Sequence, residues 1–579
     1  MAIDVRATAT RLARRGRLEA EALWVLRSAG MGSPRVLLTL LRQNQRWRGS
    51  YAAAFSTWAD LEPDRDAVVD EDGRLTYREV HQRSNAIARG LVEEGVEPGA
   101  TVAVLCRNGR GFVDATLAAS KLGARLLLLN TGFAGPQLAE VMAREEAEAV
   151  LFDPEFTDLV RDVVDDRLGV VATDDTGGPR TSTGDLVRRH LRVEPELPAQ
   201  TSRIVILTSG TTGTPKGANR PDPPAYPSTA AMMFSRIPYR LGLTYVIAAP
   251  TFHAWGLAQV ILCALTGGTA VFRRRFDPEG TLEALDEHHA EALAVVPVML
   301  QRILALPSEV RDRYDCSSLQ LVLSSGSALP GSLATAWMDA FGDSLYNFYG
   351  STEVAAATVA GPEDMRAAPG TAGRPPLGTE LRLLDDEGRV VPRGATGRIF
   401  VGNTMQFDGY TGGGTKETID GLMSTGDLGH LDEAGRLFVE GRDDDMIVSG
   451  GENVFPREVE DLLSDHPAVA DVGVVGVDDE EFGQRLAAFV VAQPGAVVDE
   501  AELQAYVKTH LATYKVPRSI TFVDEIPRNP TGKILRRRLE EHAPAEAARG
   551  RQRPSCPSPS WARMGSNHRP SDDESPADV

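Results

Sequence analysis

Between about residue 100 and residue 350, short apolar runs alternate with longer stretches of helical period. The run TVAVLC (101–106) is followed by the helical stretch GFVDATLAASKLG (111–123) and then by RLLLLN (125–130), and the alternation recurs up to residue 342. Apolar strands of five or six residues that alternate with longer helices predict parallel sheets covered by helices on both faces. The number of such units predicts two sheets.

After about residue 370 the pattern changes. Turn sequences at 386–388 and 432–435 separate short strands, which predicts a small antiparallel β region. From about residue 442, two helical stretches (456–466 and 499–512) flank two strand-like runs between them. This mixture predicts a compact α+β domain of about 100 residues. The last 39 residues contain six Pro and six Ser without an apolar period, so we expect disorder there.

The fold class expected from these patterns is α/β. We expect a large N-terminal domain of two parallel-type sheets with helices and a small β-barrel region, followed by a small α+β C-terminal domain. The expected boundaries are a basic N-terminal helical segment at 1–48, the large domain at 49–441, the C-terminal domain at 442–540 and a disordered tail at 541–579. A chain of 579 residues is too long for one ordinary core, which agrees with this division.

Composition places the chain among globular proteins of the cytoplasm. Its 42% apolar and 25% charged residues are typical of a soluble protein, and no apolar run approaches the roughly 20 residues that span a bilayer. The N-terminus has no short apolar segment with a cleavage site, so we expect no secretory signal. The four cysteines are scattered singly, with neither disulfide nor metal-site spacing, which favours a reducing, cytoplasmic setting.

The net charge of −20 argues against a general nucleic-acid binder, whose phosphate contacts require basic surface. The charge is unevenly distributed, however. Residues 1–48 carry ten Arg against Asp4, Glu19 and Glu21, which is +7 and leaves −27 for the remainder. Two stretches of this segment are basic and helical in period. Such helices can lie on the inner face of an anionic membrane, and the alternative is a solvated cap on the first domain.

The stretch TSGTTGTPKG (208–217) follows an apolar run and combines hydroxyls, glycines and one lysine. A Walker A loop requires Lys directly after its second glycine, whereas Gly213 is followed by Thr214 and Pro215 before Lys216. A P-loop kinase or switch is therefore disfavoured. The remaining interpretation is a loop whose backbone N–H groups, hydroxyls and single cation follow phosphate oxygens, and the alternative is a flexible polar turn.

Together with six downstream blocks, this loop resembles the signature of the adenylate-forming superfamily, which includes acyl-CoA synthetases, peptide adenylation domains and beetle luciferases. The blocks are PTFHAWG (250–256), SGSALP (325–330), YNFYGSTE (346–353), STGDLG (424–429), GRDDDMIVSGGENVFPREVE (441–460) and PRNPTGKILRR (527–537). The likeness covers roughly 50–540, and the chain looks most similar to fatty acyl-CoA synthetases of actinobacterial type. The large domain would then be an AMP-binding adenylation domain, and the C-terminal domain would be mobile.

The resemblance implies a nucleotide site. Tyr349 offers an aromatic face for stacking on adenine, and Glu353 is a hard oxygen ligand for Mg²⁺, although it could instead be an acid at a helix N-terminus. By resemblance Thr208 and Glu353 hold magnesium, and Asp427, which alone could be a turn residue, binds the ribose with Arg442 as its companion. The other residues implied in nucleotide binding are Ser209, Gly210, Thr211, Thr212, Gly213, Lys216, Ser327, Ala328, Gly350, Ser351, Thr352 and Lys533.

The resemblance also implies a catalytic cycle. Lys533 would neutralise the charge that grows on the α-phosphate, whereas alone it would read as a surface lysine in a basic run. Lys216 and Glu353 would act on the leaving phosphates. Asp444 would be the hinge about which the small domain turns. His253, which alone would be structural, would border the acyl channel.

The predicted function is that of an ATP-dependent acyl-CoA synthetase, which activates a medium- or long-chain fatty acid as an acyl-adenylate and transfers it to coenzyme A. The stretch SGGENVFPREVE is typical of acyl- and aryl-CoA synthetases, with Gly450 and Gly451 suited to close approach of the pantetheine arm. The predicted cofactors are ATP, Mg²⁺ and coenzyme A. The alternatives are a fatty acyl-AMP ligase that delivers to a carrier protein, and a catalytically silent nucleotide sensor.

One departure from the family pattern follows Lys216 and Gly217. The family normally continues with Val or Ala and a helix, whereas here a Pro-rich stretch, 219–228, intervenes. This stretch is expected to delay the helix and to alter the loop's handling of phosphate.

Overall fold

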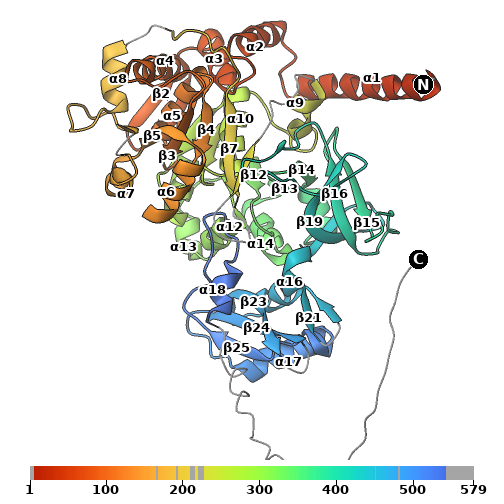
Figure 1. Cartoon of the computed structure of the whole chain (residues 1–579). Helices are drawn as coiled ribbons and strands as arrows, with labels where there is room; N and C mark the ends of the chain where they lie inside the picture. Colours follow the sequence, from red (N-terminus) through yellow and green to blue (C-terminus); the bar gives the residue numbers. More distant parts are fainter. Residues whose placement is uncertain are drawn as a thin grey trace, which may run out of the picture.

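The structure is a computed structural model that describes residues 5–164, 167–190, 194–208, 216–219, 227–449, 452–479 and 483–542. Two large sheets form the body of the molecule, a smaller sheet lies beside them, and a C-terminal unit lies at the end opposite the first helices (Figure 1). The expected mixed α/β fold, with a large sheet domain and a small C-terminal domain, is confirmed.

The first large sheet has seven strands, of which the five from β7 to β6 are mutually parallel. In spatial order its strands are β17 (Gly409–Tyr410), β8 (Lys216–Asn219), β7 (Arg203–Thr208), β4 (Arg125–Leu128), β3 (Thr101–Leu105), β5 (Ala147–Phe152) and β6 (Leu168–Val171). Two separate apolar clusters fill its two faces. Burial on both faces is the reason that these strands read as continuous apolar runs rather than as alternating ones.

The second large sheet has eight strands, parallel in the middle and antiparallel at both edges. In spatial order they are β14 (Ala355–Ala360), β13 (Leu345–Ser351), β12 (Leu321–Ser324), β11 (Ala292–Val295), β9 (Thr244–Ile247), β10 (Thr269–Phe272), β1 (Asp66–Asp70) and β2 (Gly73–Thr76). The strand β1 pairs in parallel with β10, so a segment near the N-terminus completes a sheet that is otherwise built after residue 240.

Helices cover and separate the two sheets. They are α3 (Ala52–Leu61), α4 (Tyr77–Glu93), α5 (Arg110–Lys121), α6 (Gly135–Arg144), α7 (Thr157–Arg161), α8 (Thr183–His190), α9 (Pro227–Phe234), α10 (Ala254–Leu265), α11 (Pro278–Glu287), α12 (Pro297–Leu304), α13 (Ser308–Arg311), α14 (Gly331–Phe341) and α15 (Pro362–Ala367). The helix α10 lies between the sheets, because Leu257 belongs to the core of the first and Val260 to the core of the second. Its N-terminus is therefore held from both sides.

The small β region after residue 370 is a five-stranded antiparallel sheet. Its strands are β15 (Glu380–Leu384), β16 (Gly397–Gly402), β18 (Thr418–Ile419), β19 (Leu422–Leu431) and β20 (Leu437–Arg442). The turn sequences that predicted it lie at Asp385–Arg389, between β15 and β16, and at Asp432–Arg436, between β19 and β20. In each turn the first Asp accepts from the backbone of the last Arg and pairs with its side chain.

The C-terminal unit contains the second five-stranded sheet. Its elements are β21 (Ile447–Ser449), β22 (Glu452–Val454), α16 (Pro456–Ser464), β23 (Val469–Asp479), β24 (Gly483–Ala492), α17 (Glu500–His510), β25 (Ser519–Phe522) and α18 (Arg536–Glu540), with 3-10 turns at Asp443–Asp445 and Thr513–Lys515. It has apolar clusters of its own on both faces of that sheet. The tail after residue 542, for which we predicted disorder, lies outside the described residues.

The basic N-terminal segment forms two helices, α1 (Val5–Ser28) and α2 (Pro34–Arg46). They lie along the upper edge of the molecule in Figure 1, where α1 runs over α9 and extends beyond it. None of the described helices is long and apolar enough to cross a membrane.

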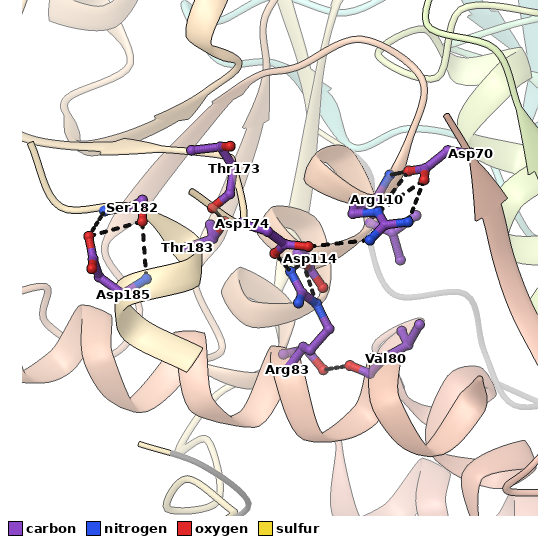
Figure 2. A network of polar contacts seen from close by, with 12 residues as sticks. Asp70, Val80, Arg83, Arg110, Asp114, Thr173, Asp174, Ser182, Thr183 and Asp185 are labelled. Carbon is purple, nitrogen blue, oxygen red and sulfur yellow. Dashed lines mark hydrogen bonds and ion pairs between the residues drawn. The ribbon is translucent and has the colours of Figure 1, made fainter. Parts of the chain in front are cut away.

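A network of ion pairs joins the two large sheets (Figure 2). Arg83 on α4 donates to Asp114 on α5 over 2.6 Å and to Asp174 over 2.5 Å. Arg110 donates to Asp70, on β1 of the second sheet, over 2.6 Å. The Asp114 side chain is 1% exposed, and burial raises the pKa of this carboxyl against the opposing effect of Arg83. The network therefore fixes helices of the first sheet to a strand of the second.

Arg83→Met leaves the carboxylate of Asp114 buried without its main partner, and we expect the free energy of unfolding to fall by about 3–5 kcal/mol. Urea unfolding followed by tryptophan fluorescence measures the change. Arg78→Met is the matched control on the same helix, because the Arg78–Asp64 pair is exposed and is worth at most about 1 kcal/mol. Adding Asp114→Leu to Arg83→Met should restore most of the loss. A double variant as unstable as the single one would refute the stranded charge as the cause.

Candidate active site

The phosphate-loop segment lies between two paired strands. β7 ends at Thr208 and β8 begins at Lys216, and these two residues are directly paired. Ser209, Gly210, Thr211, Thr212 and Gly213 lie outside the described residues, as does most of the Pro-rich stretch, at 220–226. Helix resumes at Pro227 in α9, which agrees with the expected delay.

Three further candidate segments follow strands of the second sheet. Ser327 and Ala328 come directly after β12, in a loop that Gly326 opens with a φ of +97°. Tyr349, Gly350 and Ser351 end β13, and Thr352 and Glu353 form the turn to β14. Gly350 is required by close approach, because a Cβ there would lie 1.8 Å from the carbonyl oxygen of Ala355. Ligand sites of α/β proteins form at such strand ends.

Glu353 is a buried carboxylate in a turn between two strands, so the alternative of an acid at a helix N-terminus does not apply. Its Oε1 accepts a hydrogen bond of 2.9 Å from the hydroxyl of Tyr410, on β17. The ammonium of Lys216 lies 5.5 Å from the centre of the Tyr410 ring. Tyr410 thus contacts two candidate site residues, Glu353 and Lys216.

Asp427 and Arg442 face each other across β19 and β20. Asp427 lies within a strand rather than a turn, and its carboxylate accepts a hydrogen bond from the hydroxyl of Tyr349. Burial raises the pKa of the Asp427 carboxyl, and the hydrogen bond from Tyr349 and the charges of Arg442 and Lys533 oppose this rise. The Tyr349 hydroxyl, also buried, has a pKa well above its ordinary value. The two residues form a polar pair that joins β13 of the second large sheet to β19 of the small sheet.

Lys533 reaches this region on a short hairpin of the C-terminal unit. Asn529 braces the hairpin, because its side chain accepts from the backbone N–H of Lys533 over 2.9 Å and its own N–H donates to the carbonyl of Lys533. Gly532, with a φ of +81°, lies against the large domain, where an added Cβ would be 3.4 Å from Ser327 Oγ. An added Cβ at Gly326 would lie 3.5 Å from Thr531 of the hairpin, so the hairpin that carries Lys533 packs against the loop after β12. The positive charge of Lys533 lowers the pKa of both Asp427 and His253.

A second contact holds the C-terminal unit in this position. The side chain of Gln301, on α12, donates to the carbonyl of Ala470 over 2.7 Å. Together with the hairpin, this contact holds the C-terminal unit against the large domain, and Lys533 is exposed.

His253 is the residue immediately before α10 and belongs with this group. Its ring packs 4.5 Å from that of Phe252, and its Nε2 is buried without a hydrogen-bond partner among the described residues. Burial, reinforced by the charge of Lys533, lowers the pKa of His253 to about 4. At neutral pH the His253 imidazole is therefore uncharged, and its Nε2 lacks a hydrogen-bond partner among the described residues.

The predicted hinge and thiol-site residues are only partly described. Asp444 lies in the 3-10 turn Asp443–Asp445, which joins β20 to β21, but its side chain is not described. Gly450 and Gly451 lie outside the described residues.

Sequence reasoning missed Tyr410 and Asn529. Tyr410 follows a glycine in FDGYTGGG, and nothing in that spacing indicates a bond to Glu353, which is 57 positions earlier. Asn529 was visible in PRNPTGK, where an Asn before a Pro-Thr-Gly turn is a common turn former. Both residues hold candidate site residues in place.

The arrangement gathers groups suited to a nucleotide bearing phosphates and to an anion that reacts with it. A half-buried carboxylate with a tyrosine hydroxyl can accept from ribose hydroxyls, and the ammonium of Lys216 can bind phosphate oxygens. An ammonium delivered from a separate unit can neutralise charge that develops between them. Among the described residues, no cluster of three His, Cys, Asp or Glu side chains forms an all-protein metal cage.

The chain matches two family models. The family model described as AMP-binding enzyme matches residues 55–411, and that of the AMP-binding enzyme C-terminal domain matches residues 458–533. The chain is 34% identical over 492 residues to a 2-succinylbenzoate–CoA ligase of Bacillus cereus, an alignment that covers 83% of this chain and 96% of the relative.

Two other relatives differ in the acceptor that their names state. The chain is 31% identical over 504 residues to the fatty acid–acyl-carrier-protein ligase ScoC of Streptomyces coeruleorubidus, with 85% of this chain and 96% of the relative covered. It also matches the structure of the amide bond synthetase McbA from Marinactinospora thermotolerans, with a TM-score of 0.75 and 27% identity, over 85% of this chain and 99% of that one.

The depressed pKa of His253 predicts a pH dependence of stability. The unfolded chain takes up this proton near pH 6.5, whereas the folded protein does so only near pH 4, so stability is full above pH 6.5 and falls as the pH drops toward 4. The free energy of unfolding of the unaltered protein should fall between pH 7 and pH 5, and His253→Gln should remove about 2 kcal/mol of that fall. Urea unfolding at both pH values measures it, and parallel losses in the two proteins would contradict the assignment.

Proposed function

The chain belongs to the AMP-binding enzyme family, and from this premise we propose that it is an AMP-forming acid–thiol ligase that joins a carboxylic acid to coenzyme A. The observation that carries the proposal is the packing of the Lys533 hairpin, from the C-terminal unit, against the loop after β12 of the large domain. A cation on a separate unit can be present for one half-reaction and leave for the other.

The proposed reaction has two steps. An oxygen of the substrate carboxylate attacks the α-phosphorus of ATP, pyrophosphate leaves, and acyl-AMP remains. The thiol of coenzyme A then loses its proton and attacks the acyl carbon, and AMP leaves with the bonding electron pair. Lys533 stabilises the charge on the α-phosphate in the first step, while Lys216 and the 208–217 loop hold the β- and γ-phosphates that depart.

We assign the nucleotide to the groups around Asp427. Asp427 and Arg442 take the ribose hydroxyls, the ring of Tyr349 stacks on adenine, and Ser327, Ala328 and the turn from Gly350 to Thr352 enclose the base. The hydrogen bond from Tyr349 fixes the Asp427 carboxylate for this task.

Magnesium fits the residues present. Glu353 is a carboxylate held by Tyr410, and a hydroxyl such as that of Thr208 is a suitable second oxygen donor. Mg²⁺ usually binds through one or two protein oxygens plus substrate phosphates, which agrees with a site lacking a three-residue cage among the described residues. When bound, the ion would supply charge neutralisation for the triphosphate.

The second step requires Lys533 to leave and the thiol to enter. We propose that the C-terminal unit turns about Asp444 and that the backbone at Gly450 and Gly451 then borders the pantetheine arm. Two of the contacts that hold the present arrangement, and that such a turn would break, are the Gln301–Ala470 hydrogen bond and the packing of Gly532 on Ser327.

For the acid, we propose a medium- or long-chain fatty acid. The support is the apolar face of α10 beside His253, and the relative named as a fatty acid ligase. Other relatives are named for acids of different shape, such as 2-succinylbenzoate, so the substrate is set by side chains that line the channel rather than by the fold. Transfer to a carrier protein is the second candidate, because ScoC is named for that acceptor.

Lys533→Ala should lower the rate of acyl-adenylate formation by at least about 10²–10³, because it removes the cation at the α-phosphate. Thioester formation from supplied acyl-AMP and coenzyme A should be unchanged, since Lys533 is absent from that step. ATP–pyrophosphate exchange measures the first half-reaction and thioester absorbance the second. Arg537→Ala is the matched control, a neighbouring cation whose side chain is 79% exposed. Equal loss in both half-reactions would contradict the assigned role.

A screen of carboxylic acids by pyrophosphate release should give the highest kcat/KM for a fatty acid of medium or long chain. With coenzyme A present, acyl-AMP should disappear as thioester forms. A higher kcat/KM for an aromatic acid would refute the proposed acid while leaving the ligase intact. Acyl-AMP that persists beside coenzyme A but is consumed by an acyl-carrier protein would establish the second candidate. Absence of exchange with every acid would favour a silent nucleotide sensor.

A further inference from the structure

The first two helices display large apolar side chains to solvent. Leu23 and Trp24 on α1 are 54% and 70% exposed, and Leu38 and Leu41 on α2 are 68% and 61% exposed. The other exposed large apolar residues of the described chain are scattered over other elements: Val92, Leu197, Val390, Val497, Tyr514 and Phe522. A pair on each of two consecutive helices is therefore a local concentration.

These side chains are exposed although the helices themselves are packed. On α1, Ala22, Val25 and Leu26 are buried in the main core, and Glu19 accepts hydrogen bonds from Ser228 at the start of α9. Leu23 and Trp24 lie on the opposite side of the same turns. The helix is thus fixed by one face, and its other face is unpartnered among the described residues.

The helix α2 repeats this arrangement. Its Gln43 is buried and hydrogen-bonded to both Asp60 and Trp47, which anchors the C-terminal half of the helix. Leu38 and Leu41 face outward, one turn apart. Figure 1 places α1 and α2 along one edge of the molecule, at the end opposite the C-terminal unit. We call the surface formed by these four apolar residues, Leu23, Trp24, Leu38 and Leu41, and by Arg17, Arg27 and Arg35 the N-terminal edge.

The charge of this edge is opposite to that of the body. Residues 1–48 carry +7 and the remainder of the chain −27. Arg17 and Arg27 flank Trp24 on the exposed face of α1, and Arg35 precedes Leu38 by one turn. Within the described residues these three arginines take part in no ion pair, whereas Arg42 pairs with Asp60.

Few acids oppose these arginines. In the described part of the segment they are Glu19, which is bound to Ser228, and Glu21, which is exposed. Arg17, Arg27 and Arg35 are therefore available to an external anion.

We propose that the N-terminal edge is a docking surface for an anionic lipid bilayer. Arginines bind lipid phosphates, while Trp and Leu side chains enter the boundary between headgroups and acyl chains, and a helix lying in the interface uses both together. A second copy of this chain would offer acidic surface to the arginines, but its other exposed apolar residues are too dispersed to cover the four that project here. A bilayer satisfies both requirements.

Co-sedimentation with vesicles tests the proposal on the full chain. We expect binding to vesicles of equal parts phosphatidylcholine and phosphatidylglycerol, at least about tenfold weaker binding to phosphatidylcholine alone, and loss of binding at high salt. Leu23→Ser with Trp24→Ser should weaken binding to the anionic vesicles about tenfold or more, and Arg17→Ala with Arg27→Ala and Arg35→Ala should do the same.

Matched controls separate docking from general apolar exposure and from misfolding. Val390→Ser and Val497→Ser remove apolar residues that are 67% and 97% exposed on other elements, and they should leave vesicle binding unchanged. ATP–pyrophosphate exchange should be the same in all of these variants, because none alters the active site. Failure of the proposed ligase activity would leave vesicle binding intact, so the two proposals fail independently.

Fluorescence gives a second readout. Trp47, Trp58, Trp255 and Trp337 are buried, so Trp24 is the exposed tryptophan of the described chain. Anionic vesicles should shift the emission to the blue, and Trp24→Phe should bind vesicles but lose the shift. The proposal is overturned if the anionic vesicles do not bind, or if the serine and arginine variants bind as the unaltered protein does. It is also overturned if the edge instead mediates a concentration-dependent dimer that those variants abolish.

Discussion

The half-buried carboxylate of Asp427 is the constraint on which the rest of the candidate site depends. A carboxylate removed from water is costly unless opposite charges and hydrogen bonds compensate it. Here the compensation comes from three distant parts of the chain: the hydroxyl of Tyr349 on β13, the guanidinium of Arg442 on β20, and the ammonium of Lys533 on the C-terminal hairpin. Because the last of these belongs to a separate unit, the charge around Asp427 depends on where the C-terminal unit lies.

The same reasoning explains the state of His253. A histidine close to Lys533 would repel it if protonated, and burial at the start of α10 keeps the imidazole neutral at physiological pH. The helix α10 can hold this residue because its two faces are packed into different cores, which leaves its N-terminus little freedom. The acid to be activated would enter beside a neutral ring and a mobile cation. Relatives with this scaffold are named for acids as different as 2-succinylbenzoate and fatty acids.

Much of this could be predicted from the sequence because it rests on local patterns. Alternating apolar strands and helices predicted the two sheets, and the phosphate-loop motif follows the apolar run that forms β7. What could not be predicted depends on contacts across long separations. β1 joins a sheet whose other strands lie mostly after residue 240, and Tyr410 bonds Glu353 from a strand in the other sheet. The pairing of Arg83 with Asp114 joins two helices whose polar residues would, by pattern alone, be read as solvent-facing. Periodicity reports which residues are buried together, but not which buried charges meet.

The division of charge along the chain extends the argument beyond the active site. An acidic body is repelled from an anionic surface, so only the basic edge formed by α1 and α2 can approach it closely. The uneven charge therefore determines the orientation of the bound molecule as well as its affinity for the surface. Figure 1 places the C-terminal unit at the end opposite that edge, where a bilayer bound by α1 and α2 would not obstruct it. A molecule docked in this way keeps the Lys533 hairpin free to leave and return, which a two-step ligase requires. Docking through the exposed faces of α1 and α2 is therefore compatible with the proposed turn of the C-terminal unit.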